Sequence, residues 1–416
     1  MTARELLEME PPKDVLVLGT DEAGYGPNLG PLLVGATCWS APVGSEGNAL
    51  RNAFAVPSES TKNLEPSPRA SNARAKKRRA APETPLFDLC LPETTPEDAA
   101  ALATTDALVE RLNTALAPVS AARGVFPLVD SKRLYAGSKS LDKLERSFFI
   151  AAALLNLELD SFQEATRVIA TESNPLDAPS WERDAALELP VAQKTKDPDR
   201  PIAAALEPVQ ALFARERLAL LALRARRVQP REFNAMLDRP MLKSDLIADV
   251  TTATLVETLR DVLRAQANGS QPVYAIALCD KLGGRDRYLA ILQSRFPNAT
   301  IATIQEARAA SVYRLVVENA RDRNGELFRF QRDVAIEIRF TAKGESNAPT
   351  ALASIVAKYL RELAMTVFNA FWKRATGNDA LVPTAGYPVD APRFRNDVEA
   401  TRRALGIRLQ DFWRNK

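Results

Sequence analysis

The chain contains no histidine among its 416 residues. This absence excludes catalytic triads built on histidine, histidine-ligated zinc sites and an imidazole general base. Cysteine is scarce as well: Cys38, Cys90 and Cys279 are scattered and odd in number, so they provide neither a disulfide framework nor a four-cysteine zinc site and favour a reducing compartment. Any catalysis must therefore depend on carboxylates, lysines, hydroxyls, thiols or a bound metal.

Long apolar runs are also missing. No stretch of about 18 apolar residues predicts a membrane span, and the first residues do not resemble a signal peptide, so we expect a cytoplasmic protein with no membrane partner. Neither sign of charge dominates, because 55 Lys and Arg against 52 Asp and Glu leave a net charge of +3. That balance says little about nucleic-acid binding, which depends on where charge is clustered. Nothing in the sequence indicates an oligomeric state.

Strand-like and helical patterns are mixed along the chain, which predicts an α/β fold. Short apolar runs predict strands at 15–20 and 32–39, forming a hairpin with a long loop, and at 273–279. Further strands are expected at 299–304, 312–318 and 332–340, and helices at about 96–116, 139–157, 202–226, 242–267, 286–295 and 350–373. Residues 41–95 and 158–200 are polar and rich in proline, so we interpret them as insertions in a single domain.

Asp21 and Glu22 stand where the first predicted strand ends in a loop rich in glycine and proline, at 21–31. A solvated turn is the ordinary interpretation of such a pair. A dinucleotide site is disfavoured, because the glycine spacing is wrong, Pro27 opposes a helix start and two carboxylates would repel a pyrophosphate. Carboxylates at a strand end are well suited to hold a hard divalent cation. Asp280 follows another predicted strand and is either a third ligand or a turn residue.

Four segments, in order, resemble motifs of the ribonuclease HII family. They are Asp-Glu-Ala-Gly-x-Gly-Pro at 21–27, Asp-Ser-Lys-x-Leu at 130–134, Ala-Ser-Ile-x-Ala-Lys-x-x-Arg-Glu at 353–362, and Gly-Tyr-Pro at 386–388. The resemblance covers the N-terminal hairpin, the region around 128–157 and most of 230–410. It implies a ribonuclease-H-like α/β fold, with a mixed central sheet flanked by helices.

The resemblance also implies a catalytic metal site. Asp21, Glu22, Asp280 and Glu362 would be the catalytic carboxylates, holding Mg²⁺ or Mn²⁺, with two metal ions expected. Glu362 departs from the family pattern, which generally has Asp there. Without the resemblance, Lys358 and Glu362 on the predicted helix would be interpreted as a solvated face.

Six residues are expected to bind substrate by the same resemblance: Gly24, Tyr25, Gly26, Lys132, Lys358 and Tyr387. The glycine loop would approach the ribose hydroxyl, which distinguishes RNA from DNA. Tyr387 would pack against the sugar. Tyr25 departs from the family, which usually has Arg or Lys between the two glycines. Each lysine is equally consistent with a plain solvated side chain.

The expected activity is metal-dependent endoribonuclease cleavage of RNA–DNA hybrids or of ribonucleotides embedded in duplex DNA, leaving a 5′-phosphate and a 3′-hydroxyl. Two alternatives stay open. Tyr25 leaves room for a structure-specific DNA nuclease, and Glu362 leaves room for a nucleic-acid-binding protein that has lost catalysis. The basic run at 76–79 is either an auxiliary phosphate contact or a solvated loop.

Overall fold

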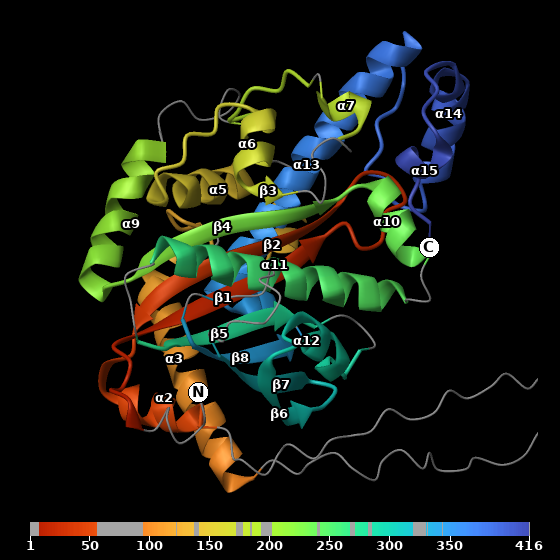
Figure 1. Ribbon diagram of the computed structural model, residues 1–416. Coiled ribbons are helices and arrows are strands. Elements are labelled where there is room, and N and C mark those ends of the chain that lie inside the picture. The colour runs from red at the N-terminus through yellow and green to blue at the C-terminus, as the bar shows by residue number, and fades with distance from the viewer. Residues whose placement is uncertain are drawn as a thin grey trace, which may run out of the picture.

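The computed structural model (Figure 1) describes most of the chain. The described residues are 8–55, 95–121, 123–136, 141–171, 178–183, 185–192, 202–238, 242–266, 271–281, 285–318, 330, 332–342 and 344–415. Cys90 and the basic run at 76–79 lie outside them. No helix within these ranges is long and apolar enough to cross a membrane.

One mixed sheet of eight strands forms the centre of the described fold. In sheet order the strands are β3 (Ala170–Thr171), β4 (Ala219–Val228), β2 (Leu32–Pro42), β1 (Asp14–Ala23), β5 (Val273–Asp280), β8 (Val334–Thr341), β7 (Ala310–Val317) and β6 (Ala299–Glu306). β2 runs antiparallel to β1 and to β4, whereas β5 runs parallel to β1 and β8 parallel to β5. The predicted α/β fold, with a mixed central sheet flanked by helices, is confirmed.

Helices cover both faces of the sheet (Figure 1). α13 (Ala348–Thr376) packs on β1 and β2, with α3 (Pro96–Ser120) and α5 (Asp142–Leu154) against it, and α11 (Lys243–Ala265) crosses the opposite face. The other helices are α2 (Gly47–Ala53), α4 (Ser131–Ala136), α6 (Phe162–Val168), α7 (Ser180–Arg183), α9 (Ile202–Glu216), α10 (Pro230–Leu237), α12 (Leu289–Arg295), α14 (Ala391–Ala404), α15 (Leu409–Phe412) and the short 3₁₀ turns η1 (Gly44–Glu46) and η4 (Gly344–Ser346).

Burial on both faces explains why β1 has an almost continuous apolar run. Val15 and Val17 belong to the core under α13, whereas Leu16 and Leu18 belong to the core under α11. Alternate side chains of a strand point to opposite faces, so a strand covered on both sides needs apolar residues at successive positions. The same pattern in β5 made both strands recognisable in the sequence.

Two glycines let α13 approach the sheet closely. A Cβ atom on Gly19 of β1 would lie 2.1 Å from the carbonyl carbon of Pro349, and one on Gly35 of β2 would lie 2.2 Å from the carbonyl oxygen of Ala353. Both contacts are with helix backbone, which cannot rotate away. A side chain at either position would therefore displace α13. Ser354, the residue that follows Ala353 on this helix, would move with it.

One predicted element is wrong in part. The helix predicted over 202–226 ends at Glu216, and residues 219–228 form β4 instead. This segment is rich in Ala, Leu and Arg, which favour a helix locally. β4 nevertheless pairs along the whole of β2, and that tertiary pairing overrides the local preference. The region 158–200, predicted to be an insertion, contributes α6, α7 and the edge strand β3 in its described part.

Candidate metal site

Asp21 and Asp280 lie at the same end of two neighbouring parallel strands. The register pairs Thr20 of β1 with Cys279 of β5, so each aspartate is the next residue along its strand. Parallel strands present their carboxyl ends at one edge of a sheet. The two acidic residues, far apart in the sequence, therefore lie side by side because of the strand pairing.

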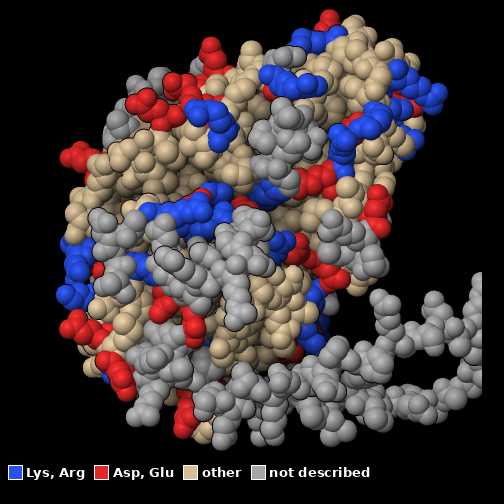
Figure 2. All heavy atoms as spheres, viewed as in Figure 1, with Lys and Arg blue, Asp and Glu red and all other residues tan. Residues whose placement is uncertain are grey.

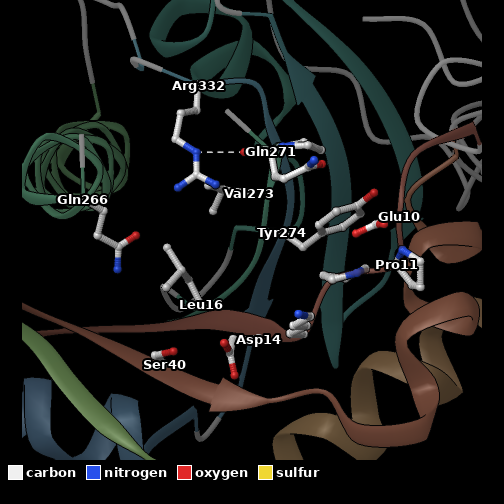
Figure 3. Close-up of a pocket in the computed structure, with 13 residues that line it drawn as sticks. Glu10, Pro11, Asp14, Leu16, Ser40, Gln266, Gln271, Val273, Tyr274 and Arg332 are labelled. Atoms are coloured by element: carbon white, nitrogen blue, oxygen red, sulfur yellow. Dashed lines mark hydrogen bonds between the residues drawn. The ribbon is translucent and has the colours of Figure 1, made fainter. Parts of the chain in front are cut away.

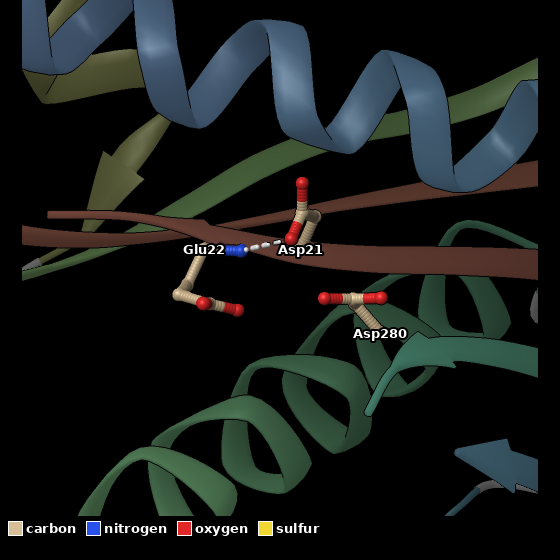
Figure 4. Close-up of side chains that lie close together, drawn as sticks. All are labelled: Asp21, Glu22 and Asp280. Carbon is tan, nitrogen blue, oxygen red and sulfur yellow. Dashed lines mark hydrogen bonds between the residues drawn. The ribbon is translucent and has the colours of Figure 1, made fainter. Parts of the chain in front are cut away.

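Glu22 completes a cluster of three carboxylates, shown in Figure 4. One carboxylate oxygen from each of Asp21, Glu22 and Asp280 lies within 4.8 Å of the other two. Asp21 is buried, at 5% exposure, whereas Glu22 and Asp280 are partly exposed. The cluster thus joins one buried carboxylate to two that are partly exposed to solvent.

Backbone amides fix two of the three carboxylates. The Glu22 amide donates to Asp21 Oδ1 at 2.8 Å, and the Gly344 amide donates to Asp280 Oδ1 at 3.0 Å. Gly344 begins η4, immediately before α13, and a Cβ on it would lie 3.2 Å from the Asp280 Cα. The start of α13 is therefore closely packed against the end of β5.

The negative charges of the three carboxylates repel one another and disfavour ionisation of Asp21. Burial raises the pKa of Asp21 well above its usual value, and the neighbouring charges of Glu22 and Asp280 raise it further. Hydrogen bonds from Ser354 and from the Glu22 amide act in the opposite direction without cancelling the effect. A positive charge placed among these oxygens would remove the repulsion that disfavours ionisation.

The donor set fits a hard divalent cation. Mg²⁺ binds oxygen ligands at about 2.0–2.1 Å, so two of its ligands stand at most about 4 Å apart. Oxygens within 4.8 Å of one another can reach such a cation with small side-chain adjustments, and water can complete the coordination. The described residues offer neither a histidine nor an exposed thiol to the cluster, which disfavours zinc.

A chain of hydroxyl groups supports Asp21 from α13 and α4. The Ser354 hydroxyl hydrogen-bonds Asp21, and Ser131 Oγ lies 2.8 Å from Ser354 Oγ. Either serine hydroxyl can be the donor in this second bond. Ser131 is the first residue of α4, and Lys132 beside it is exposed. The Asp-Ser-Lys segment at 130–132 is therefore linked to Asp21 through Ser131 and Ser354.

Glu362 lies on the same helix as Ser354 but outside the three-carboxylate group. It is two helical turns further along α13, about 12 Å at 1.5 Å per residue. Its Oε1 accepts from Lys358 Nζ at 2.5 Å, and its Oε2 lies 3.4 Å from the Tyr135 hydroxyl. The Lys358 ammonium also lies 4.6 Å from the centre of the Tyr135 ring. Glu362 is thus paired with a lysine in this structure, and its role as a fourth metal ligand stays a prediction.

The glycine loop and Tyr387 form one surface beside the carboxylates. Gly24 has φ +94°, and a Cβ on it would lie 2.6 Å from Arg361 Nε, so only glycine fits there. A Cβ on Gly26 would lie 3.8 Å from the Tyr387 ring. Tyr25 and Tyr387 are 40% and 44% exposed. The structure therefore brings together four of the residues predicted to bind substrate.

Lys243, which the sequence did not single out, supplies a positive charge at this surface. It begins α11, and its ammonium lies 4.7 Å from the centre of the Tyr25 ring, within the range of a cation–π contact. Tyr25 itself carries no charge. Lys243 of α11 thus places a positive charge beside Tyr25, an uncharged residue of the glycine loop.

Other residues of this region escaped the sequence analysis for identifiable reasons. Ser354 was visible as the polar residue one turn before Lys358, but Ser131 could be linked to it only by the packing of α4 on α13. Arg361 precedes Glu362 on α13 but is only 1% exposed, which the local sequence does not indicate. Arg414 is also 1% exposed and reaches the glycine loop from the end of the chain, which no local pattern indicates.

The hollows that the described residues form away from the carboxylates include two on the sheet. One, of about 380 Å³, is at the opposite end of β1 and β5 (Figure 3) and is lined by Glu10, Pro11, Pro12, Lys13, Asp14, Leu16, Ser40, Gln266, Gln271, Pro272, Val273, Tyr274 and Arg332. The other, of about 700 Å³, lies between β4 and α11, where Figure 2 shows a band of basic side chains. Arginines that line this hollow pair with acids: Arg224 with Asp261, Arg226 with Glu232, and Arg295 with Asp249. Their charges are balanced within the protein.

Comparisons with known proteins give distant structural matches. No protein-family model and no curated protein sequence matches the chain. A crystal structure of Bst-RNase HIII in complex with Mn²⁺ aligns with a TM-score of 0.34 and 12% identity, over 96% of this chain and 66% of that one. A crystal structure of a mutant protein of Bst-RNase HIII gives 0.36 and 12%, over 99% and 68%. The ribonuclease H2 from Pyrococcus horikoshii OT3 gives 0.34 and 13%, over 96% and 92%. This chain thus spans about two thirds of the length of the ribonuclease HIII chains.

Proposed function

We propose that this chain is a divalent-metal-dependent nuclease of the type 2 ribonuclease H kind. Its substrates would be RNA–DNA hybrids or duplex DNA containing ribonucleotides. The observation that carries the proposal is the convergence of Asp21, Glu22 and Asp280 on one point at the end of β1 and β5. Three oxygen donors beside a partly exposed glycine loop are suited to hold a cation next to a phosphodiester.

The three carboxylates would hold Mg²⁺ or Mn²⁺, and Glu362 would join them after leaving Lys358. When bound, such a cation lowers the pKa of water and offsets the negative charge of the reacting phosphate. Hydrolysis forms a bond from the water oxygen to phosphorus and breaks the bond from phosphorus to the 3′-oxygen. The products would be a 5′-phosphate and a 3′-hydroxyl.

The chain's own residues would bind and orient the substrate. Backbone groups at Gly24 and Gly26 would contact the ribose 2′-hydroxyl, and Tyr387 would pack against the sugar. Lys358 and Lys132 would face phosphates on the α13 side of the carboxylates. Tyr25 with Lys243 would contact the strand on the α11 side, combining a ring surface with a positive charge.

The test is cleavage of three labelled duplexes: one containing a single ribonucleotide, one full RNA–DNA hybrid and one all-DNA control. Each is incubated with Mg²⁺, Mn²⁺ or chelator, using the native chain, Asp21→Asn and Asp280→Asn. Asp379→Asn is the matched control, because Asp379 is fully exposed and remote from the cluster in sequence. We expect metal-dependent cleavage of the two ribonucleotide-containing duplexes, lost in both site variants and retained in the control.

Other outcomes separate the alternatives. Cleavage of the all-DNA duplex at a comparable rate would replace the ribonuclease with a DNA nuclease on the same carboxylates. Metal-independent binding of all three duplexes without cleavage would identify a nucleic-acid-binding protein. Cleavage that survives Asp21→Asn would remove the carboxylate cluster from the mechanism.

A further inference from the structure

Arg414 holds the glycine loop from its buried side. Its Nη2 donates to the carbonyl oxygens of Gly24, at 2.8 Å, and of Pro27, at 2.6 Å. Its backbone amide donates to Asn28 O at 2.7 Å, and the Asn28 side chain donates back to Arg414 O at 3.0 Å. The guanidinium also lies 4.9 Å from the centre of the Phe233 ring. The end of the chain is thus fixed against the loop by backbone and side chain together.

Arg361 reaches the same loop from α13. Its Nη2 donates to Leu29 O, at 3.4 Å, and to Ala385 O, at 3.1 Å. Its Nε lies 2.6 Å from the position that a Cβ on Gly24 would occupy. Two guanidinium groups therefore bind carbonyl oxygens of one short loop.

The two arginines are unusual because each is buried and forms no ion pair within the described part of the chain, although the charge of Glu362 acts on Arg361. Among the described residues, neither has a carboxylate oxygen within ion-pairing distance, and Nε and Nη1 of both have no hydrogen-bond partner. Burial and the charge of Arg361 lower the pKa of Arg414 to about 9. Burying like charges without a counter-ion is unfavourable for folding alone. The loop next to them is where an anionic strand would neutralise this charge.

The carbonyl bonds also set the direction of the loop amides. In a trans peptide the carbonyl of one residue and the N–H of the next point in opposite directions. Because Arg414 draws the Gly24 carbonyl inward, the Tyr25 N–H points to the other side of the loop. The rings of Tyr25 and Tyr387 are partly exposed, so solvent and a substrate can reach this part of the molecule.

We propose that Arg414, supported by Arg361, is a positioning residue for substrate recognition. By holding the carbonyl of Gly24 inward, it directs the Tyr25 amide toward the ribose and phosphate of a nucleic-acid strand. Its bond to the Pro27 carbonyl anchors the other end of the loop, where the Asn28 amide donates to Gly386 O. Its buried charge makes that face of the loop electropositive. This inference rests on the proposed function, because the substrate it names is the substrate of the same site.

The experiment compares the native chain with Arg414→Met, Arg414→Lys and Arg402→Met. Arg402 is the matched control, since it is a largely buried arginine near the C-terminus that bonds Glu399 and the Ile407 carbonyl but not the loop. Steady-state kcat and KM are measured on the single-ribonucleotide duplex with Mn²⁺. Fluorescence anisotropy in chelator gives the affinity ratio between that duplex and all-DNA.

For Arg414→Met we expect KM to rise about tenfold or more, with kcat within about threefold of the native value, because charged hydrogen bonds that organise binding are lost. The affinity ratio should fall toward one. Arg414→Lys should recover part of both effects, since its ammonium can reach one of the two carbonyls. Arg402→Met should change thermal stability but neither KM nor the ratio. An Arg414→Met protein that folds and keeps the native KM and ratio would overturn the inference.

Hydrogen exchange distinguishes failure of this inference from failure of the proposed function. If the native chain neither cleaves nor binds nucleic acid, the proposed function fails, and exchange of the Tyr25 and Gly26 amides still tests the loop. Faster exchange in Arg414→Lys than in Arg402→Met would support positioning of the loop by Arg414. Equal exchange in the two variants would overturn it. The same comparison serves if Arg414→Met does not fold.

Discussion

Replacing Asp21 with Asn should stabilise the protein without metal and destabilise it relative to the native chain when metal is present. The substitution keeps the size of the side chain and an oxygen that can accept from the Glu22 amide and from Ser354. It removes one charge from a cluster whose oxygens lie within 4.8 Å of one another. The metal-free fold therefore loses repulsion and keeps its hydrogen bonds.

The magnitude follows from the geometry. Two unit charges at this separation repel by about 3 kcal/mol at an effective dielectric constant of about 20, and Asp21 has two such neighbours. The folded protein can escape by protonating Asp21, which at pH 7 costs about 4 kcal/mol for a carboxyl of ordinary pKa. That cost is an upper limit, so we expect Asp21→Asn to raise the free energy of unfolding by about 2 kcal/mol in chelator.

The pH dependence has a definite sign. The pKa of Asp21 is raised in the folded state, so between its ordinary and its raised value the folded chain binds more protons than the unfolded chain. The native protein then loses stability as pH rises through this window, whereas Asp21→Asn does not. The difference between the two should be near zero below the ordinary pKa, grow as pH rises through the window, and reach its full size above the raised pKa.

The assay is urea unfolding of the native chain, Asp21→Asn and Asp379→Asn, in chelator at several pH values and with Mn²⁺. Metal that binds only the folded state adds about 2.7 kcal/mol at a hundredfold excess over its Kd, and this gain should be small in Asp21→Asn. The order of stability then reverses on adding Mn²⁺. An Asp21→Asn protein less stable than the native chain in chelator at neutral pH, or one that gains as much from Mn²⁺, would refute the reasoning.

Three further predictions concern other parts of the fold. Glu337 is fully buried between two arginines, so Glu337→Gln should lower the free energy of unfolding by about 3–5 kcal/mol in urea titrations, with no effect on Mn²⁺ affinity. Gly19→Ala should cost about 3 kcal/mol and also weaken Mn²⁺ binding measured by calorimetry, because a methyl group there displaces α13. Lys243→Gln should lower duplex affinity, and the slope of log affinity against log salt concentration should fall by about one phosphate contact. Fluorescence anisotropy at low and high salt measures this slope. An unchanged slope would contradict a phosphate role for Lys243.

Much of the carboxylate cluster could be predicted because its determinants are local. Asp21, Glu22 and Asp280 each follow an apolar run, and strand ends meet at one edge of a sheet. The glycine loop could be recognised by its composition. Glu362 could be placed on the helix, but its distance from the other three carboxylates depends on how α13 packs on the sheet, which the sequence does not show.

Local sequence patterns were sufficient to specify the strands β1, β2 and β5, the long helices and the acidic residues at the strand ends. These follow from apolar periodicity and turn residues, which act over a few positions. Long-range packing was needed to make residues 219–228 a strand, to let Ser131 support Asp21 through Ser354, and to bring Arg414 to the glycine loop. Each of these depends on contacts between segments far apart in the chain, where local preference is neutral or opposed and packing supplies the free energy.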